Sequence, residues 1–240
     1  MMVIKDLFEI NRRLSYDLWN VTCRNEKPTG LSPRLIFPVK RIQHEIRISE
    51  QEARILYCNI LNNLNYFYSI ETPTDKRYKH TGNTEVSALS DLSIYKNTCD
   101  KKNHQNYYFD KLANIEFKAH NPAEKNIEKD IEKLVKEGID GNWVHILKNI
   151  NSATLPVLFQ KFINSIKECS KKFDKISILF GITVLDKKFS IIKHLGWNNS
   201  GIGIDQYLKD FFVMPQLQGQ SIDQQKVLLV NNQWDFLKCK

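Results

Sequence analysis

Two acids and a lysine near the middle of the chain stand in patterns that alternate with apolar residues. Glu116 and Lys118 flank Phe117, and Asp91 lies in a similar apolar run. In a strand, Glu116 and Lys118 would project from one face, about 6.5 Å apart. Charged groups on an inner sheet face are expensive to desolvate unless they pair or bind a ligand. Two close carboxylates suit a hard cation such as Mg²⁺, and a lysine beside the ion could activate water or stabilise charge on a phosphate.

The elements that would position these residues are two strands. Alternating apolar residues predict one strand over residues 87–95 and another over residues 112–119, joined by a long polar loop over 96–111. As antiparallel neighbours, these strands would bring Asp91 within reach of Glu116. Two other acid-x-lysine triplets, at 100–102 and 186–188, lack any strand pattern. The alternative for the three residues is a structural ion-pair cluster at a sheet edge.

The surrounding sequence predicts an α/β fold with a central mixed β-sheet flanked by helices. Helices are expected over 4–14, 50–63, 154–171 and 204–212, and between Asn121 and Gly138, with an extended piece over 35–42 and further strands over 66–71, 143–150, 175–185 and 226–230. A turn is expected at 72–75. Residues 49–196 would form the core, 1–48 an N-terminal extension packed on it, and 197–240 a C-terminal extension of the same domain.

The segments Ser-Asp-Leu-Ser-Ile at 90–94 and Ile-Glu-Phe-Lys-Ala at 115–119 resemble the PD-(D/E)XK nuclease superfamily, whose core has the restriction-endonuclease-like fold. The element order over about residues 49–185 is similar too: a helix carrying a glutamate, the two motif strands, a helix and another strand. Ser90 stands where the motif has a proline. The resemblance implies that Asp91 and Glu116 bind Mg²⁺, with Mn²⁺ as a substitute, and that Lys118 is the catalytic lysine.

The same resemblance implies a further catalytic glutamate on the first core helix. The candidates are Glu50 and Glu52, and Glu52 is better placed relative to the strand that follows. The alternative for Glu52 is structural, because Ser49 followed by Glu52 is also a capping-box signature.

The charge of the chain favours a polyanionic partner. The formal net charge is +8, from 35 basic and 27 acidic residues. Lys125 and Lys129 are candidate nucleic-acid contacts on the helix after the second motif strand, in a stripe with Lys133 and Lys136; a solvated helix face explains this stripe equally well. His120 is a weaker candidate for a phosphate contact. The aromatic residues at 107–109 could stack on bases or simply begin the next strand.

The expectation is a Mg²⁺-dependent deoxyribonuclease of a restriction or phage-defence type. A DNA repair or recombination nuclease is similar in core and stays open, as does a non-catalytic nucleic-acid-binding module on the same fold. A protein-interaction protein with an incidental basic surface is the remaining alternative. The five cysteines form no metal-binding pair, and no apolar run is long enough for a membrane span. We therefore expect a cytoplasmic protein with no membrane partner, and a homodimer if it cuts both strands.

Overall fold

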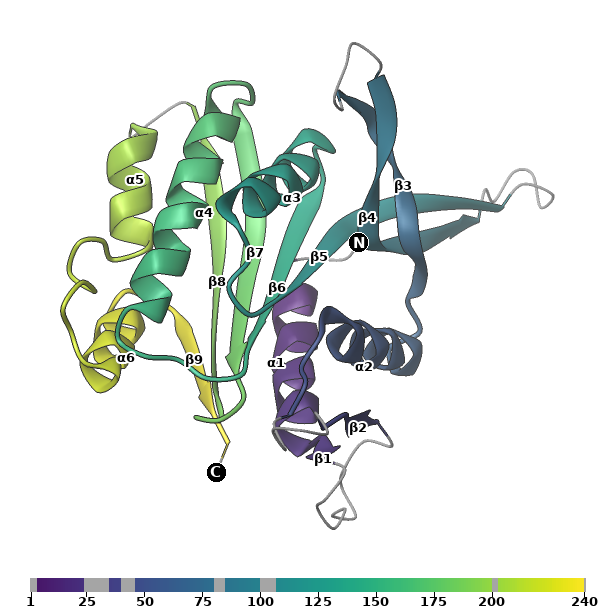
Figure 1. Cartoon of the computed structure of the whole chain (residues 1–240). Coiled ribbons are helices and arrows are strands. Elements are labelled where there is room, and N and C mark those ends of the chain that lie inside the picture. Colours follow the sequence, from purple (N-terminus) through teal and green to yellow (C-terminus); the bar gives the residue numbers. More distant parts are fainter. Residues whose placement is uncertain are drawn as a thin grey trace.

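The computed structural model describes residues 4–23, 35–39, 46–79, 85–99, 107–199 and 203–239. In this part of the chain a seven-stranded mixed sheet is flanked by helices on both faces, so the fold is α/β (Figure 1). The sheet has the order β3-β4-β5-β6-β7-β8-β9. Its strands are β3 (Phe67–Lys79), β4 (Glu85–Cys99), β5 (Tyr107–Ala119), β6 (Asp140–Leu147), β7 (Lys175–Val184), β8 (Phe189–Asn198) and β9 (Asp235–Lys238). A small separate parallel pair joins β1 (Thr22–Cys23) to β2 (Ile36–Phe37).

The pairing between neighbouring strands changes twice across the large sheet, from antiparallel to parallel and back to antiparallel. β3, β4 and β5 are antiparallel neighbours, β5, β6 and β7 are parallel, and β8 and β9 are antiparallel again. Parallel neighbours need a crossover connection, which here is a helix each time. The helices are α1 (Ile4–Asn20), α2 (Glu50–Asn63), α3 (Glu124–Lys136), α4 (Thr154–Ser170), α5 (Ile204–Phe211) and α6 (Ile222–Asn231).

The helices α1 and α2 cover one face of the sheet. Their apolar stripes, with Leu14 on α1 and Tyr57 on α2 among them, pack on Ile115 and Phe117 of β5 and on the neighbouring strands. A buried amide pair fixes α1 on the sheet, because Asn11 and Asn142 exchange two hydrogen bonds of 2.9 and 3.0 Å.

The helices α3 and α4 cover the opposite face, and α5 and α6 extend this layer (Figure 1). Ile131 on α3 and Phe162 on α4 belong to a core that includes Trp143 of β6 and Phe180 of β7. Because side chains alternate along β5, Glu116, which lies between Ile115 and Phe117, faces this second layer. Glu116 is therefore buried beneath α3 and not in the apolar core under α2.

Several predicted elements match the structure in place and type. The helix expected over 50–63 is α2, and the motif strands expected over 87–95 and 112–119 lie within β4 and β5, which pair antiparallel. The helix expected over 4–14 continues to Asn20, with Leu18 and Trp19 buried. Residues 197–240 contribute the end of β8 and also α5, α6 and β9, whose residues share the core of the α3–α4 layer.

Other predictions are wrong. Residues 226–230 are helical and not a strand, since they belong to α6, whose capping box joins Ser221 and Gln224. The loop expected over 96–111 is strand at both ends, because β4 and β5 stay paired from Tyr95 to Cys99; residues 100–106 are not described. The turn expected at 72–75 is instead a register shift within β3, between Pro73 and Arg77. β8 had no predicted counterpart.

A last feature of the fold concerns membranes. Among the helices in the described ranges, none is both long and apolar enough to cross a bilayer.

Candidate active site

Asp91 lies where β4 and β5 separate. The last backbone pair between these strands on this side is Leu92 with Ile115. Beyond it, Asp91 Oδ2 accepts a hydrogen bond of 2.8 Å from the backbone N–H of Phe117, so the carboxylate takes the place of a ladder acceptor. The other oxygen, Oδ1, lies 3.1 Å from a guanidinium nitrogen of Arg54 on α2. Asp91 is therefore held between a strand and a helix.

Glu116 and Lys118 lie on β5 and meet the same side of α3. The Glu116 carboxylate lies 2.8 Å from Lys133 Nζ, and Lys118 Nζ lies 2.8 Å from the carboxylate of Asp130. Lys133 also lies 2.8 Å from the second oxygen of Asp130. The alternation that the sequence predicts along β5 thus gives both side chains a common environment, and α3 supplies their partners.

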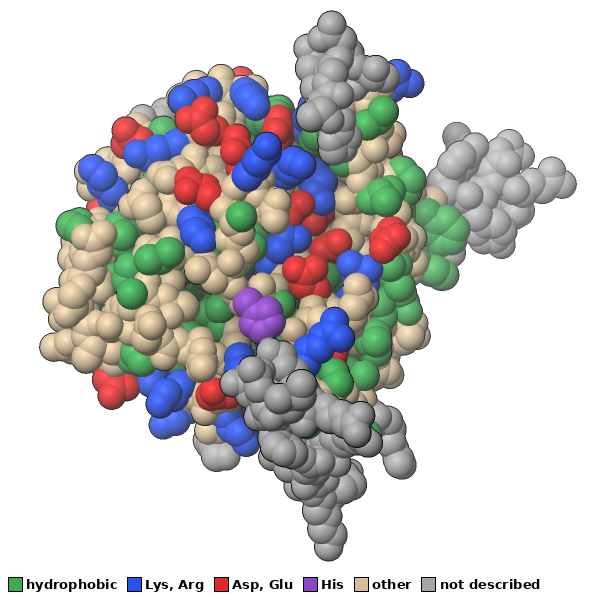
Figure 2. Space-filling view, viewed as in Figure 1, with side chains coloured by type: hydrophobic (Ala, Val, Ile, Leu, Met, Phe, Trp, Pro, Cys, Tyr) green, Lys and Arg blue, Asp and Glu red, His purple; other side chains and the backbone are tan. Residues whose placement is uncertain are grey.

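These contacts form one group of charges, which we call the acid–base cluster. Its members are Arg54, Asp91, Glu116, Lys118, Asp130 and Lys133. It joins side chains from α2, β4, β5 and α3. In Figure 2, acidic and basic side chains gather beside α3, and hydrophobic side chains lie next to them over the arm formed by β3 and β4.

The electrostatics of Glu116 are unusual for a carboxylate. Its side chain is 0% exposed. Burial raises the pKa of Glu116 to about 8; Lys133 opposes this rise, and the negative charges of Asp130 and Asp91 add to it. Asp130 and Asp91 are thus close enough to disfavour the ionised form of Glu116, and a nearby divalent cation would favour that form instead.

The two lysines of the cluster remain charged despite their burial. For Lys118, burial lowers the pKa, but Asp130 and the other acids outweigh it, and the pKa is raised. For Lys133 the same balance holds, with Glu116 and Asp130 as the acids that raise its pKa. A cationic Lys118 can stabilise negative charge on a substrate, but it cannot take a proton from water while Asp130 holds it in this form.

Histidines form the layer beside Lys118. His145 on β6 is the register partner of Lys118 and is completely buried. Its Nδ1 accepts from the Trp143 indole at 3.3 Å, so its Nε2 carries the hydrogen and donates to the carbonyl of His120 at 2.7 Å. Burial lowers the pKa of His145 to about 4, and the positive charge of Lys118 adds to this effect. A neutral His145 therefore holds the end of the strand that carries Lys118.

Buried polar atoms without hydrogen bonds collect around the cluster. In the described residues, Arg54 Nε, Ser90 Oγ, Asn114 Nδ2 and Glu116 Oε1 are buried without a hydrogen-bond partner. The other Glu116 oxygen, Oε2, is paired with Lys133, whose Nζ lies 2.8 Å away. Such atoms are rare in folded proteins, so each of them needs a partner such as a water molecule or a ligand.

No protein-family model, curated protein or solved structure matches this chain. The case for a function therefore depends on the geometry of the site itself.

A magnesium ion at this cluster would have to keep several of its waters. Across the described ranges, no group of three or more His, Cys, Asp and Glu side chains is arranged to hold a metal. Magnesium usually takes one or two carboxylates, with waters and substrate oxygens completing its shell. In this cluster Asp91 and Glu116 would be those carboxylates, and the ion would have to replace Arg54 and Lys133 beside them.

The structure gives Glu52 its structural role. Its Oε2 accepts from the backbone N–H of Ser49 at 2.9 Å and from the Ser49 hydroxyl at 2.5 Å, which completes the capping box at the start of α2. The residue of α2 that reaches Asp91 is Arg54. The catalytic role of Glu52 stays a prediction, and that of Glu50 as well.

The lysine stripe of α3 divides into two kinds. Lys125 and Lys129 are exposed, as a nucleic-acid contact requires. Lys133 is not on a solvated face, because its side chain is only 12% exposed and is paired to Glu116 and Asp130. Two members of the cluster, Asp130 and Arg54, were not predicted from the sequence. The only signal was their position, since each adjoins a buried apolar residue of its helix.

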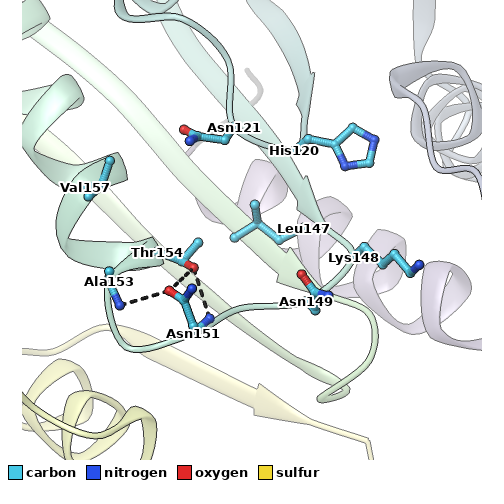
Figure 3. A pocket seen from close by; sticks show the side chains of 9 residues that line it. All are labelled: His120, Asn121, Leu147, Lys148, Asn149, Asn151, Ala153, Thr154 and Val157. Carbon is cyan, nitrogen blue, oxygen red and sulfur yellow. Dashed lines mark hydrogen bonds between the residues drawn. The ribbon is translucent and has the colours of Figure 1, made fainter.

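Two cavities lie close to the cluster. One, of about 460 Å³, lies between α3 and the β3–β4 pair and reaches Asp130 and Lys133. The other, of about 340 Å³, lies at the carboxyl ends of β5 and β6 and is drawn in Figure 3. At its base Asn151 and Thr154 hydrogen-bond to each other at the start of α4. His120 lines it, but one ring nitrogen is already 2.9 Å from the carbonyl of Ile48.

Proposed function

We propose that this protein is a metal-dependent nuclease with a restriction-endonuclease-like core of the PD-(D/E)XK kind. The observation that carries the proposal is the convergence of Asp91, Glu116 and Lys118 in one acid–base cluster, which also contains two unpaired buried polar atoms, Arg54 Nε and Glu116 Oε1. The order of α2, β3, β4, β5, α3 and β6 supports it, because apart from β3 it is the order of the resemblance: a helix with a glutamate, two motif strands, a helix and a strand.

Asp91 and Glu116 would hold the ion, which is Mg²⁺ or, as a substitute, Mn²⁺. When bound, such an ion would polarise a phosphate oxygen and lower the pKa of a bound water. Glu116 suits this role because burial makes its unpaired ionised form costly, and a divalent cation would offset that cost. Asp91 suits it because the hydrogen bond from Phe117 fixes one oxygen and directs the carboxylate.

Lys118 would stabilise the negative charge that develops on the phosphate oxygens. Asp130 acts through Lys118, since it holds the ammonium group at 2.8 Å and keeps it charged. Such preorganised charges in a site with little water contribute strongly to phosphoryl-transfer rates. Asp130 is a positioning residue in this scheme and does not contact the substrate.

DNA is the proposed substrate, in the cytoplasm and in the setting of restriction or phage defence; a repair or recombination nuclease would use the same core. The basic balance of the chain and the exposed Lys125 and Lys129 beside the cluster favour a polyanion. A homodimer is part of the proposal only if the protein cuts both strands.

The test is cleavage of supercoiled plasmid with Mg²⁺ or Mn²⁺. Asp91→Ala and Lys118→Met should each lower the rate at least about a hundredfold, the usual effect of losing a group that acts on the reacting atoms. Lys209→Ala, which removes an exposed lysine of α5, is the charge-matched control and should cleave like the wild type. Mn²⁺ binding by calorimetry without DNA gives a second readout: it should be lost in Asp91→Ala and kept in Lys118→Met. Equal cleavage by all variants would refute the proposal.

One observation favours a second function, a non-catalytic nucleic-acid-binding module. The carboxylates of the cluster already have cationic neighbours, Arg54 for Asp91 and Lys133 for Glu116. A site that had lost its metal could be stabilised in this way. Salt-sensitive DNA binding without Mn²⁺ binding or cleavage would select this function.

A further inference from the structure

The ammonium group of Lys133 lies at a point where oxygen atoms from three elements meet. Its Nζ is 2.8 Å from Glu116 Oε2 on β5, 2.8 Å from Asp130 Oδ1 on α3 and 3.0 Å from the carbonyl oxygen of Leu89 on β4. Carboxylate and carbonyl oxygens are the hard ligands that divalent cations such as Mg²⁺ prefer in proteins. We call these three oxygen atoms the oxygen cage.

The oxygen cage is buried, and the lysine satisfies it only in part. The side chain of Lys133 is 12% exposed and that of Glu116 is 0% exposed. Glu116 Oε1, the second oxygen of the same carboxylate, is buried without a hydrogen-bond partner. Such an atom needs a partner, and the ammonium group reaches only Oε2. A divalent cation that keeps several of its waters could serve both oxygens of Glu116.

The surroundings of Lys133 leave room for this side chain to move, whereas Asp130 is held from its other side. Lys133 lines the cavity of about 460 Å³ between α3 and the β3–β4 pair. Asp130 Oδ2 lies 2.8 Å from Lys118 Nζ, so this carboxylate has a second cation of its own. If an ion took the position of Lys133 Nζ, the displaced side chain could turn into the cavity, and Asp130 would keep its contact with Lys118.

We infer that the oxygen cage is a position for a divalent metal ion, and that Lys133 is a resident cation that fills it until the metal displaces the lysine. The inference rests on the proposed function and deepens it, because Glu116 belongs both to the cage and to the proposed centre. It adds Asp130 and the carbonyl of Leu89 to the groups that hold the ion. It also makes Lys133 a regulator of metal affinity, since the ion has to break a buried ion pair in order to enter.

The experiment measures Mn²⁺ binding by calorimetry without nucleic acid, so that cleavage does not contribute. Lys133→Met should bind Mn²⁺ at least about tenfold more tightly than the wild type, because the ion no longer has to displace an ammonium group from a buried carboxylate. Lys133→Gln should also gain affinity, and it provides the same test if the methionine variant does not fold. Asp130→Asn should weaken Mn²⁺ binding in the wild type and should remove the gain in either Lys133 variant.

Two control variants separate the oxygen cage from the general charge of the protein. Lys133→Arg keeps a cation at this position, and Lys209→Met removes the positive charge of an exposed lysine on α5. Both should bind Mn²⁺ no more tightly than the wild type. The inference would be overturned by unchanged or weaker binding in the Lys133→Met and Lys133→Gln variants, by an equal gain in Lys209→Met, or by Mn²⁺ binding that does not depend on Asp130.

The inference and the proposed function can fail separately. If the wild type cleaves plasmid and neither Lys133→Met nor Lys133→Gln gains affinity for Mn²⁺, the nuclease stands and the resident cation is refuted. If Lys133→Met binds Mn²⁺ more tightly and the gain requires Asp130, but no form of the protein cleaves DNA, the metal position stands and the nuclease is refuted.

Discussion

His145 makes the folded protein sensitive to mild acid in a way that can be measured. Its imidazole is completely buried, and burial lowers its pKa to about 4 from an ordinary value of 6.5. Between these values the unfolded chain binds a proton at this position and the folded chain does not. Stability must therefore fall as the pH drops through this range, and the loss is complete below about pH 4.

The size of the effect follows from the shift. Each pKa unit corresponds to about 1.4 kcal/mol, so the full contribution of His145 is about 3 kcal/mol. At pH 5 roughly 2 kcal/mol of that would already be lost. This is a large fraction of the stability of an ordinary domain.

The assay is denaturant unfolding at pH 7.5 and at pH 5, in the wild type and in His145→Gln. The variant removes the titrating ring and keeps an amide able to donate to the His120 carbonyl. Other groups titrate in both proteins, so the wild type should lose about 2 kcal/mol more than the variant between the two pH values. The fluorescence of Trp143, whose indole donates to His145 at 3.3 Å, should report the unfolding. The same loss in both proteins would show that His145 does not titrate as its burial requires.

Three further substitutions separate structure from chemistry. Glu116→Gln mimics the protonated side chain that burial favours, so the free energy of unfolding at pH 7 should change by less than about 1 kcal/mol. Calorimetry should show no Mn²⁺ binding by this variant. Binding equal to that of the wild type would show that Glu116 is not part of the metal site. Glu52→Gln keeps the arm of the capping box that reaches Ser49, so melting temperature and plasmid cleavage should both stay unchanged, and a loss of cleavage alone would assign Glu52 to catalysis. Gly181→Ala would place a Cβ 2.8 Å from Asn11 Nδ2, so the free energy of unfolding measured with denaturant should fall by about 1–3 kcal/mol. An unchanged free energy of unfolding would mean that α1 does not approach β7 this closely.

The parts of the fold that the sequence predicts well are those set by local patterns. The capping box at Ser49 and the apolar stripe after it predict the helix over 50–63, and α2 has these bounds. The period of two along a strand predicts that Glu116 and Lys118 share a face, and both meet α3. Neither conclusion needs knowledge of the rest of the chain.

The parts that escape prediction depend on partners far away in the sequence. β4 continues to Cys99 because Tyr107 and the residues after it pair with its end, and polar residues reveal nothing of that pairing. Lys133 resembles its exposed neighbours in the lysine stripe, and only the packing of α3 over β5 turns it towards Glu116. The helix α6 is different, since its capping box at Ser221 was present in the sequence as a local signal.

Under the proposed function, the charges of the acid–base cluster would couple the binding of the metal to the binding of the nucleic acid. In the free protein Arg54, Lys118 and Lys133 are the positive charges of the cluster, and Asp91, Asp130 and a Glu116 that burial tends to protonate face them. A divalent cation added to this group would leave an excess of positive charge, even after Glu116 gives up its proton. A phosphodiester supplies the missing negative charge and a partner for any lysine that the ion displaces. The metal and the nucleic acid should therefore bind with positive coupling, each raising the affinity for the other by the same factor.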